Sequence, residues 1–247
     1  MFSVVNELRL SRMMLSGSPR ERLNPPGSHP HTRTLVHSLV LFGNDGIPDV
    51  FDQLTNGILD VVDVHNVTRM ELGYGYDMRQ HYTTLLNLAG PSLKHLKVQV
   101  DTDSMRSYTR PELTYDLSHF TELESLSFVF LLSSGGEIEH QAFDMLSTLS
   151  LTSSHSSVII QIHCRYEFSM ELVPDHNLLR ITLDPAPWQR LGSLLRRISS
   201  LRRVIFVFFQ LAQEIVAVPK LVEERLHDAL ALPPACTLEL QSELETE

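Results

Sequence analysis

The sequence predicts an α/β fold, an irregular solenoid with a parallel sheet on one face and helices on the other. Two observations lead to this prediction. A six-residue pattern with apolar residues at its first, fourth and sixth positions recurs along the chain, and stretches with helical spacing of apolar residues lie between several of its copies. Because each strand and helix unit is too small to bury its apolar face alone, neighbouring units are expected to stack.

Each copy of this pattern, which we call the hexad, predicts a short strand. The fourth and sixth residues lie two apart and therefore point to one face of a strand, whereas the fifth residue points to the other face. One face is expected to be core and the other free. The clearest copies begin at Val36, Val67, Leu93, Leu123, Leu178 and Leu201, and weaker copies begin at Ser157 and Ala235.

Apolar residues follow helical spacing in residues 50–62, 78–88, 143–149, 188–198 and 221–230. Gly90 and Pro91 are expected to end the second of these helices, while Pro187 and Pro219 suit the first turn of the helices that follow them. Strands that alternate with helices pair in parallel through right-handed crossovers. We therefore expect the hexads to form one parallel sheet.

Composition divides the chain into a flexible N-terminal arm or linker, residues 1–33, and an α/β repeat domain, residues 34–247. Glycine and proline are concentrated among polar residues in 16–33, which leaves little apolar surface to bury. Removing the arm is therefore expected to leave the fold intact. Residues 1–15 lack an export-signal pattern and are interpreted as a frayed terminus, with an arginine-containing mitochondrial presequence as the alternative.

The overall composition excludes several classes of protein. A net charge of −10, from 30 acidic and 20 basic residues, argues against a nucleic-acid partner and against an anionic membrane surface. The strongest apolar stretch, residues 204–211, is far shorter than the roughly 20 residues that cross a membrane. Two cysteines, Cys164 and Cys236, are expected to be buried free thiols in a reducing compartment. The expected location is the cytoplasm, with the nucleus as the alternative.

No motif for chemistry is found in the sequence. It contains no nucleophile elbow, phosphate loop or dinucleotide fingerprint, so no catalytic or cofactor-binding residue is predicted. The closest histidine and cysteine groupings, His29 with His31 and His163 with Cys164, lack a second ligand pair at the spacing of structural zinc sites. We therefore expect neither a metal nor a cofactor, and we expect the chain not to be an enzyme. An enzyme with an unrecognised site and a structural or vestigial fragment without a ligand are the alternatives.

Three segments carry a resemblance to a known family. Gly90-Pro-Ser-Leu-Lys-His-Leu, Tyr115-Asp-Leu-Ser-His-Phe-Thr-Glu-Leu-Glu-Ser-Leu and Ser199-Ser-Leu-Arg-Arg-Val look like leucine-rich-repeat strands. With Trp188 leading a helix into the hexad at Leu201, they resemble the repeat region of fungal F-box and leucine-rich-repeat proteins over roughly residues 35–240. The resemblance implies an irregular leucine-rich-repeat-like solenoid.

The chain departs from that family at two points. The family's asparagine or cysteine after the last strand leucine appears once, as Asn44, and its N-terminal F-box has no counterpart before Leu35. The resemblance therefore implies the substrate-recognition part of a ubiquitin-ligase receptor, or a family member without its ligase connection. Both roles are protein-binding roles. The family resemblance alone does not supply an enzymatic activity.

The free face of the predicted sheet is the candidate site, with a protein of unknown identity as the expected partner. Polar side chains alternate with core residues on two strands and should lie on this face, together with adjoining loops such as residues 133–137. The candidate protein-binding residues are Lys97, Gln99 and Asp101 on one strand and Gln161, His163 and Arg165 on the other.

Two further features of the sequence have alternative explanations. Residues 204–209 are apolar on both faces, which indicates either burial under a terminal helix such as residues 221–230 or exposure as a ligand-binding patch. Ser199 lies among Arg196, Arg197, Arg202 and Arg203, which indicates either cations that stabilise a helix C-terminus or a phosphorylation site for a basic-directed kinase.

Overall fold

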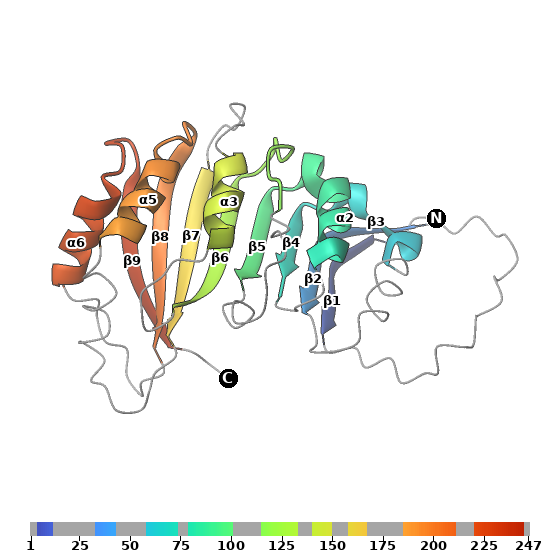
Figure 1. Cartoon of the computed structure of the whole chain (residues 1–247). Helices are drawn as coiled ribbons and strands as arrows, with labels where there is room; N and C mark the ends of the chain where they lie inside the picture. The colour runs from blue at the N-terminus through green and yellow to red at the C-terminus, as the bar shows by residue number, and fades with distance from the viewer. Residues whose placement is uncertain are drawn as a thin grey trace, which may run out of the picture.

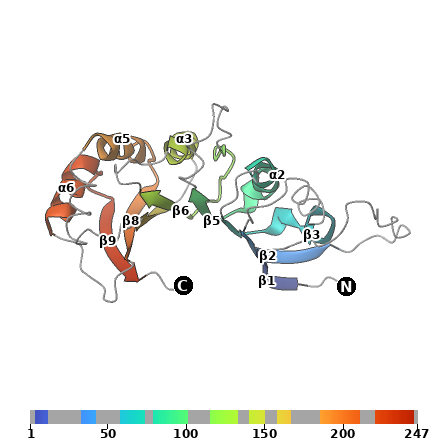
Figure 2. The ribbon, with the colours of Figure 1, turned by 60° about the horizontal axis from the view of Figure 1, so that its bottom comes forward.

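The strands and helices form two layers, one sheet and one row of helices along a single face of it. The computed structural model describes residues 4–11, 33–42, 58–73, 79–100, 115–132, 140–149, 158–166, 185–210 and 220–244. Within these residues the sheet has nine strands. Figures 1 and 2 show the sheet as an arch, with α2, α3, α5 and α6 on its outer side.

The strands lie in the sheet in nearly the order in which they occur in the sequence. The order is β1-β2-β4-β5-β6-β7-β8-β9, with the short β3 beside β2, so β1 and β9 are the two edges of the sheet. Each described pairing is parallel, which confirms the parallel sheet predicted from the hexads. The strands are β1 (Val4–Ser11), β2 (Thr34–Phe42), β3 (Val62–Asp63), β4 (Arg69–Leu72), β5 (His95–Val100), β6 (Ser125–Leu132), β7 (Val158–Tyr166), β8 (Leu201–Gln210) and β9 (Thr237–Leu244).

The helices occupy the stretches that helical spacing predicted. They are α2 (Arg79–Ala89), α3 (His140–Leu149), α5 (Ala186–Leu195) and α6 (Lys220–Leu230), with 3-10 turns η1 (Val64–Asn66) and η2 (Gly90–Ser92). Of the predicted helix at 50–62, residues 58–61 are helical and residues 50–57 lie outside the described residues. Gly90 and Pro91 end α2 in η2, and Pro187 lies in the first turn of α5, as expected. Pro219 and the hexad at Leu178 lie outside the described residues.

The core consists of rows of apolar side chains that run across the sheet. The fourth residue of each described hexad pairs in register with the fourth residue of the next, and the sixth residues pair likewise. The fourth-residue row is Leu39, Met70, Leu96, Leu126, Ile160, Val204 and Leu238, and its members are buried or partly buried in the core. Trp188 of α5 closes the core from the helix side, since its ring meets that of Phe206 edge-on with centroids 5.7 Å apart.

The structure places in the sheet a segment that the sequence analysis assigned to the N-terminal arm. Residues 4–11 form β1, which pairs with β2 along most of its length. Leu8 and Leu10 pack against the core, while Glu7 and Arg9 alternate with them. A signal was available, because Val5, Leu8 and Leu10 occupy the first, fourth and sixth positions of a hexad and pair in register with Val36, Leu39 and Leu41. This copy was overlooked because it lies next to the glycine- and proline-rich stretch. Residues 12–32 lie outside the described residues.

Candidate protein-binding surface

Figure 2 shows the face of the sheet opposite the described helices, which we call the open face. The third and fifth residues of the hexads point to this face. Register pairing aligns these positions into two rows that cross the sheet. The third-residue row is Ser38, Arg69, His95, Ser125, Ile159, Arg203 and Thr237, and the fifth-residue row is Val40, Glu71, Lys97, Ser127, Gln161, Ile205 and Glu239. Both rows mix charged, polar and aliphatic side chains.

Three of the six candidate residues come together on this face. Lys97 and Gln161 belong to one row, on either side of Ser127, and Gln99 lies two residues further along β5. All three side chains are partly exposed. These positions agree with the predicted placement, because hexad spacing alone sets which residues point away from the core.

The remaining candidates are only partly placed. His163 and Arg165 belong to β7, where only their backbone is described, and His163 pairs in register with Val129 and Val207. Asp101 and the loop residues 133–137 lie outside the described residues. The candidate surface therefore rests on the central part of the sheet, from β4 to β7.

Polar side chains on the open face are joined in pairs between neighbouring strands. Lys97 Nζ lies 2.7 Å from Glu71 Oε1. The Ser127 hydroxyl donates a hydrogen bond of 2.9 Å to Gln161 Oε1, and His95 Nδ1 lies 2.9 Å from Ser125 Oγ. These contacts hold the side chains in fixed orientations, which lowers the entropy that they would lose on binding.

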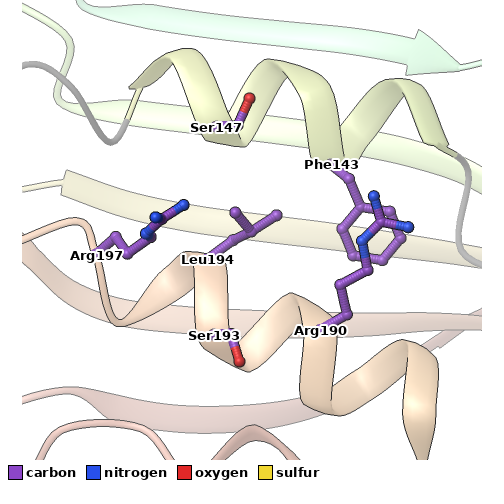
Figure 3. A pocket seen from close by; sticks show the side chains of 6 residues that line it. All are labelled: Phe143, Ser147, Arg190, Ser193, Leu194 and Arg197. Carbon is purple, nitrogen blue, oxygen red and sulfur yellow. The ribbon is translucent and has the colours of Figure 1, made fainter.

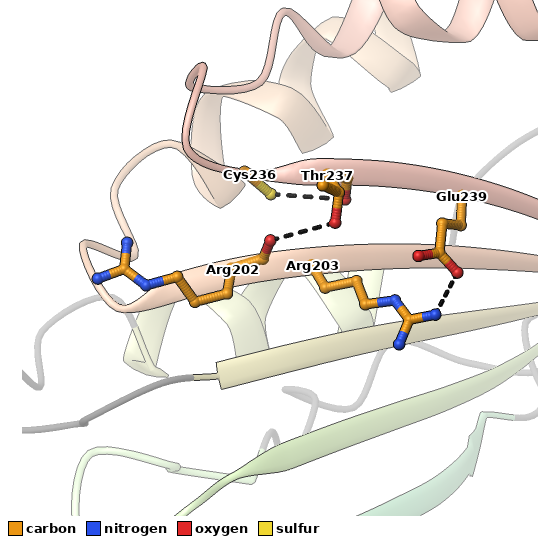
Figure 4. A network of polar contacts seen from close by, with 5 residues as sticks. All are labelled: Arg202, Arg203, Cys236, Thr237 and Glu239. Atoms are coloured by element: carbon orange, nitrogen blue, oxygen red, sulfur yellow. Dashed lines mark hydrogen bonds and ion pairs between the residues drawn. The ribbon is translucent and has the colours of Figure 1, made fainter.

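At the β8–β9 end of the sheet the same arrangement continues (Figure 4). Arg203 donates a hydrogen bond to Glu239, and this bond lowers the pKa of the Glu239 carboxyl. The Thr237 hydroxyl donates to the carbonyl oxygen of Arg202 over 3.4 Å. Glu239 is therefore ionised at neutral pH, and the face presents a pattern of both charges rather than a field of one sign.

Sequence reasoning missed Glu71, Ser127, Arg203 and Glu239 as members of this surface. A signal for them exists, because they occupy the same third and fifth hexad positions as the residues that were chosen. Choosing two strands by their polarity, rather than all strands by hexad position, left these residues out.

The strand that is apolar on both faces is buried on both. Val204 and Phe206 belong to the main core, whereas Ile205 and Val207 lie on the open face and are only 3% and 2% exposed. Val129 of β6 pairs with the same region and is 6% exposed. Burial is thus confirmed for Ile205 and Val207. The expected cover is not α6, because that helix packs on the opposite face with Val204 and Phe206.

The arginines around Ser199 are already engaged at two of four positions. Arg196 donates from Nη1 to the carbonyl oxygen of Leu230 over 2.7 Å, and Arg203 pairs with Glu239. Ser199 itself is exposed in the turn between α5 and β8, whereas Ser200 is buried. Arg196 therefore joins the C-terminus of α5 to the C-terminus of α6.

The side chains that could bind a metal, thiols among them, do not gather in one place in the described part of the chain. Among the described residues, no three histidine, cysteine, aspartate or glutamate side chains gather as metal ligands would. Cys236 is a free thiol immediately before β9 and is only partly buried, not buried as expected. Burial raises its pKa. The backbone of Cys164 lies in β7, where its side chain is not described. In this part of the chain no helix has the length and apolar character needed to cross a membrane.

Comparisons with protein-family models, with curated proteins and with solved structures found no match.

Proposed function

We propose that this chain is a non-enzymatic protein-binding module that recognises a protein partner through the open face of its sheet. The observation that carries the proposal is the alignment of polar side chains from consecutive parallel strands into rows across that face. Adjacent strands lie about 4.8 Å apart, so the accessible members of the rows offer a regularly spaced set of contacts on the central strands. These members include Arg69, Glu71, His95, Lys97 and Gln161. A specific protein interface buries about 800 Å² on each partner, which suits such a face.

The kinds of side chain on this face support binding more than catalysis. Lys97 and Glu71, like Ser127 and Gln161, use part of their hydrogen-bonding capacity on each other. Lys97, Glu71 and Gln161 remain partly exposed, whereas Ser127 is buried. Such pairs fix the pattern of donors and acceptors that a partner meets. Catalysis requires a nucleophile, acid or base held against a substrate, whereas these groups are spread along an open surface.

A more specific form of the proposal follows from the resemblance to F-box and leucine-rich-repeat proteins. In this form the chain is a leucine-rich-repeat-like solenoid in the cytoplasm or nucleus that selects substrates for a ubiquitin ligase. The repetition of strand and helix supports the repeat character. If the form is correct, cells that carry an open-face variant should accumulate the partner and show less of it ubiquitinated. A partner whose abundance and ubiquitination do not respond would contradict this specific form.

The test of the general proposal compares two matched surface variants. The open-face variant replaces Arg69, Lys97 and Gln161 with alanine, and the helix-face variant replaces Glu223, Glu224 and Arg225 of α6 with alanine. Circular dichroism and thermal unfolding must first show that both variants are folded. Each is then used as affinity bait, and captured proteins are quantified by mass spectrometry.

We expect a partner whose recovery falls at least ~10-fold with the open-face variant, a loss of about 1.4 kcal/mol or more, and is retained by the helix-face variant. Equal recovery with both variants, or loss with the helix-face variant alone, would overturn the proposal.

A further inference from the structure

A small groove lies between α3 and α5, on the helix layer and away from the open face. Its volume is about 170 Å³. The lining side chains are Phe143 and Ser147 from α3, Arg190, Ser193 and Leu194 from α5, and Arg197 from the turn that follows (Figure 3). The groove thus has an apolar middle and an arginine towards each end.

Arg190 packs on an aromatic ring, and Arg197 lies at the other end of the groove (Figure 3). The guanidinium carbon of Arg190 lies 4.5 Å from the centroid of the Phe143 ring, a cation–π contact that leaves the edge of the guanidinium free to donate hydrogen bonds. Arg197 follows seven residues later, in the turn just after α5, and a helical rise over that span is roughly 10 Å. Leu194 lies between them, facing the groove (Figure 3).

The charge of the groove contrasts with that of the chain. The chain carries a net charge of −10, but among the described residues neither Arg190 nor Arg197 pairs with a carboxylate. The Ser193 hydroxyl is occupied, because it donates to the carbonyl oxygen of Gln189 and accepts from Arg196. The polar groups available to a ligand in this groove are therefore dominated by two cations, which are complementary to carboxylates.

We propose that the groove binds an extended acidic segment of a protein partner, with a glutamate or aspartate at each end of a five-residue stretch and an apolar residue at its centre. In an extended chain, residues i, i+2 and i+4 point to one side, and the outer two lie roughly 13 Å apart. The flexible arginine side chains cover the difference from the helical rise of roughly 10 Å between them. The central apolar side chain would contact Leu194, which lies between the two arginines.

This site is independent of the open face, so its failure would leave the proposed function untouched. The probe is a fluorescein-labelled peptide with the sequence Glu-Ser-Leu-Ser-Glu between Gly-Ser flanks, titrated with the full chain at low salt. A matched peptide, Gln-Ser-Leu-Ser-Gln, removes the charges while keeping the length. The protein variants are R190Q/R197Q, R197Q alone, and R202Q as a control arginine outside the groove.

Binding of the acidic peptide is expected at concentrations below ~1 mM. It should weaken at least ~10-fold in R190Q/R197Q and at least ~3-fold in R197Q, but less than ~2-fold in R202Q. R197Q keeps the Arg190 contact with Phe143, so it tests the site even if the double variant does not fold. Higher salt should also weaken binding.

Several results would overturn the proposal. These are the absence of saturable binding up to ~1 mM, equal binding of the glutamine peptide, or unchanged affinity in the folded R197Q variant. Displacement of the peptide by inorganic phosphate at an equal concentration would mean a general anion site, and would also overturn peptide recognition.

Discussion

A methyl group on Gly192 of α5 would lie 2.2 Å from the carbonyl oxygen of Leu230 in α6. The two helices therefore meet backbone to backbone at this point, and only glycine leaves room for the contact. Gly192→Ala should lower the free energy of unfolding by about 1–3 kcal/mol, because the helices must move apart. Urea unfolding measures the change, with the exposed Gln189→Ala on the same helix as a control within ~0.5 kcal/mol. A neutral Gly192→Ala would show that α5 and α6 do not meet here.

The C-terminus of α6 offers a second prediction, because Ala231 has a φ of 44°, in the left-handed region that favours glycine. Ala231→Gly should raise the free energy of unfolding by about 0.5–1 kcal/mol through relief of this strain. Ala229→Gly, two residues earlier within α6, should lower it by about 1 kcal/mol. Thermal unfolding of the two variants measures this, because the melting temperature should rise in Ala231→Gly and fall in Ala229→Gly. Destabilisation by both substitutions would argue against the left-handed position.

Packing of β1 against the core gives a third prediction. Leu10 is partly buried, whereas Val4 on the same strand is 57% exposed. Leu10→Ala should therefore lower the free energy of unfolding by about 1–2 kcal/mol, less than for a fully buried leucine, while Val4→Ala should change it by less than ~0.5 kcal/mol. Deleting residues 1–11 should destabilise the fold further, contrary to the expectation that the arm is dispensable. If Leu10→Ala were as stable as the parent chain, β1 would not contribute to the core and the arm would be dispensable, as the sequence predicted.

The pair of Arg203 and Glu239 predicts a dependence of stability on pH. The hydrogen bond from Arg203 lowers the pKa of Glu239 below its ordinary value of 4.5. A lowered carboxyl pKa contributes stability at pH values above 4.5, and that contribution is lost as the pH falls through the folded-state pKa. Glu239→Gln should therefore lower the melting temperature at about pH 7 and have a smaller effect at about pH 3. The same melting-temperature difference at both pH values would contradict the ionic character of the contact.

The sheet was predictable because the hexad sets the positions of core and free residues along each strand. Leu96 and Leu126, for instance, are fourth residues of successive hexads and pair directly in the sheet. Parallel strands in such units pair equivalent positions, so residues at the same hexad position form one row across the sheet. For the same reason Lys97, Gln99 and Gln161 could be assigned to one face.

Contacts that depend on the approach of distant elements were not predictable in this way. Nothing near Gly192 in the sequence indicates that it meets Leu230, because the distance depends on how α5 and α6 pack on the sheet. The groove between α3 and α5 likewise brings Phe143 against Arg190 from separate units. β1 is a different case, because Val5, Leu8 and Leu10 form a hexad and the strand could have been predicted. It was assigned to the arm together with the glycine- and proline-rich residues that follow it.

Site-specific photo-crosslinking from Gln99 tests the role of the open face most directly. Gln99 is partly exposed on β5, beside Lys97 on the open face, whereas Glu223 is exposed on α6. A photoreactive residue at position 99 should form a covalent adduct with the partner that the open-face variant fails to retain, and the same residue at position 223 should not. Adducts with that partner from position 223 but not from position 99 would contradict recognition through the open face.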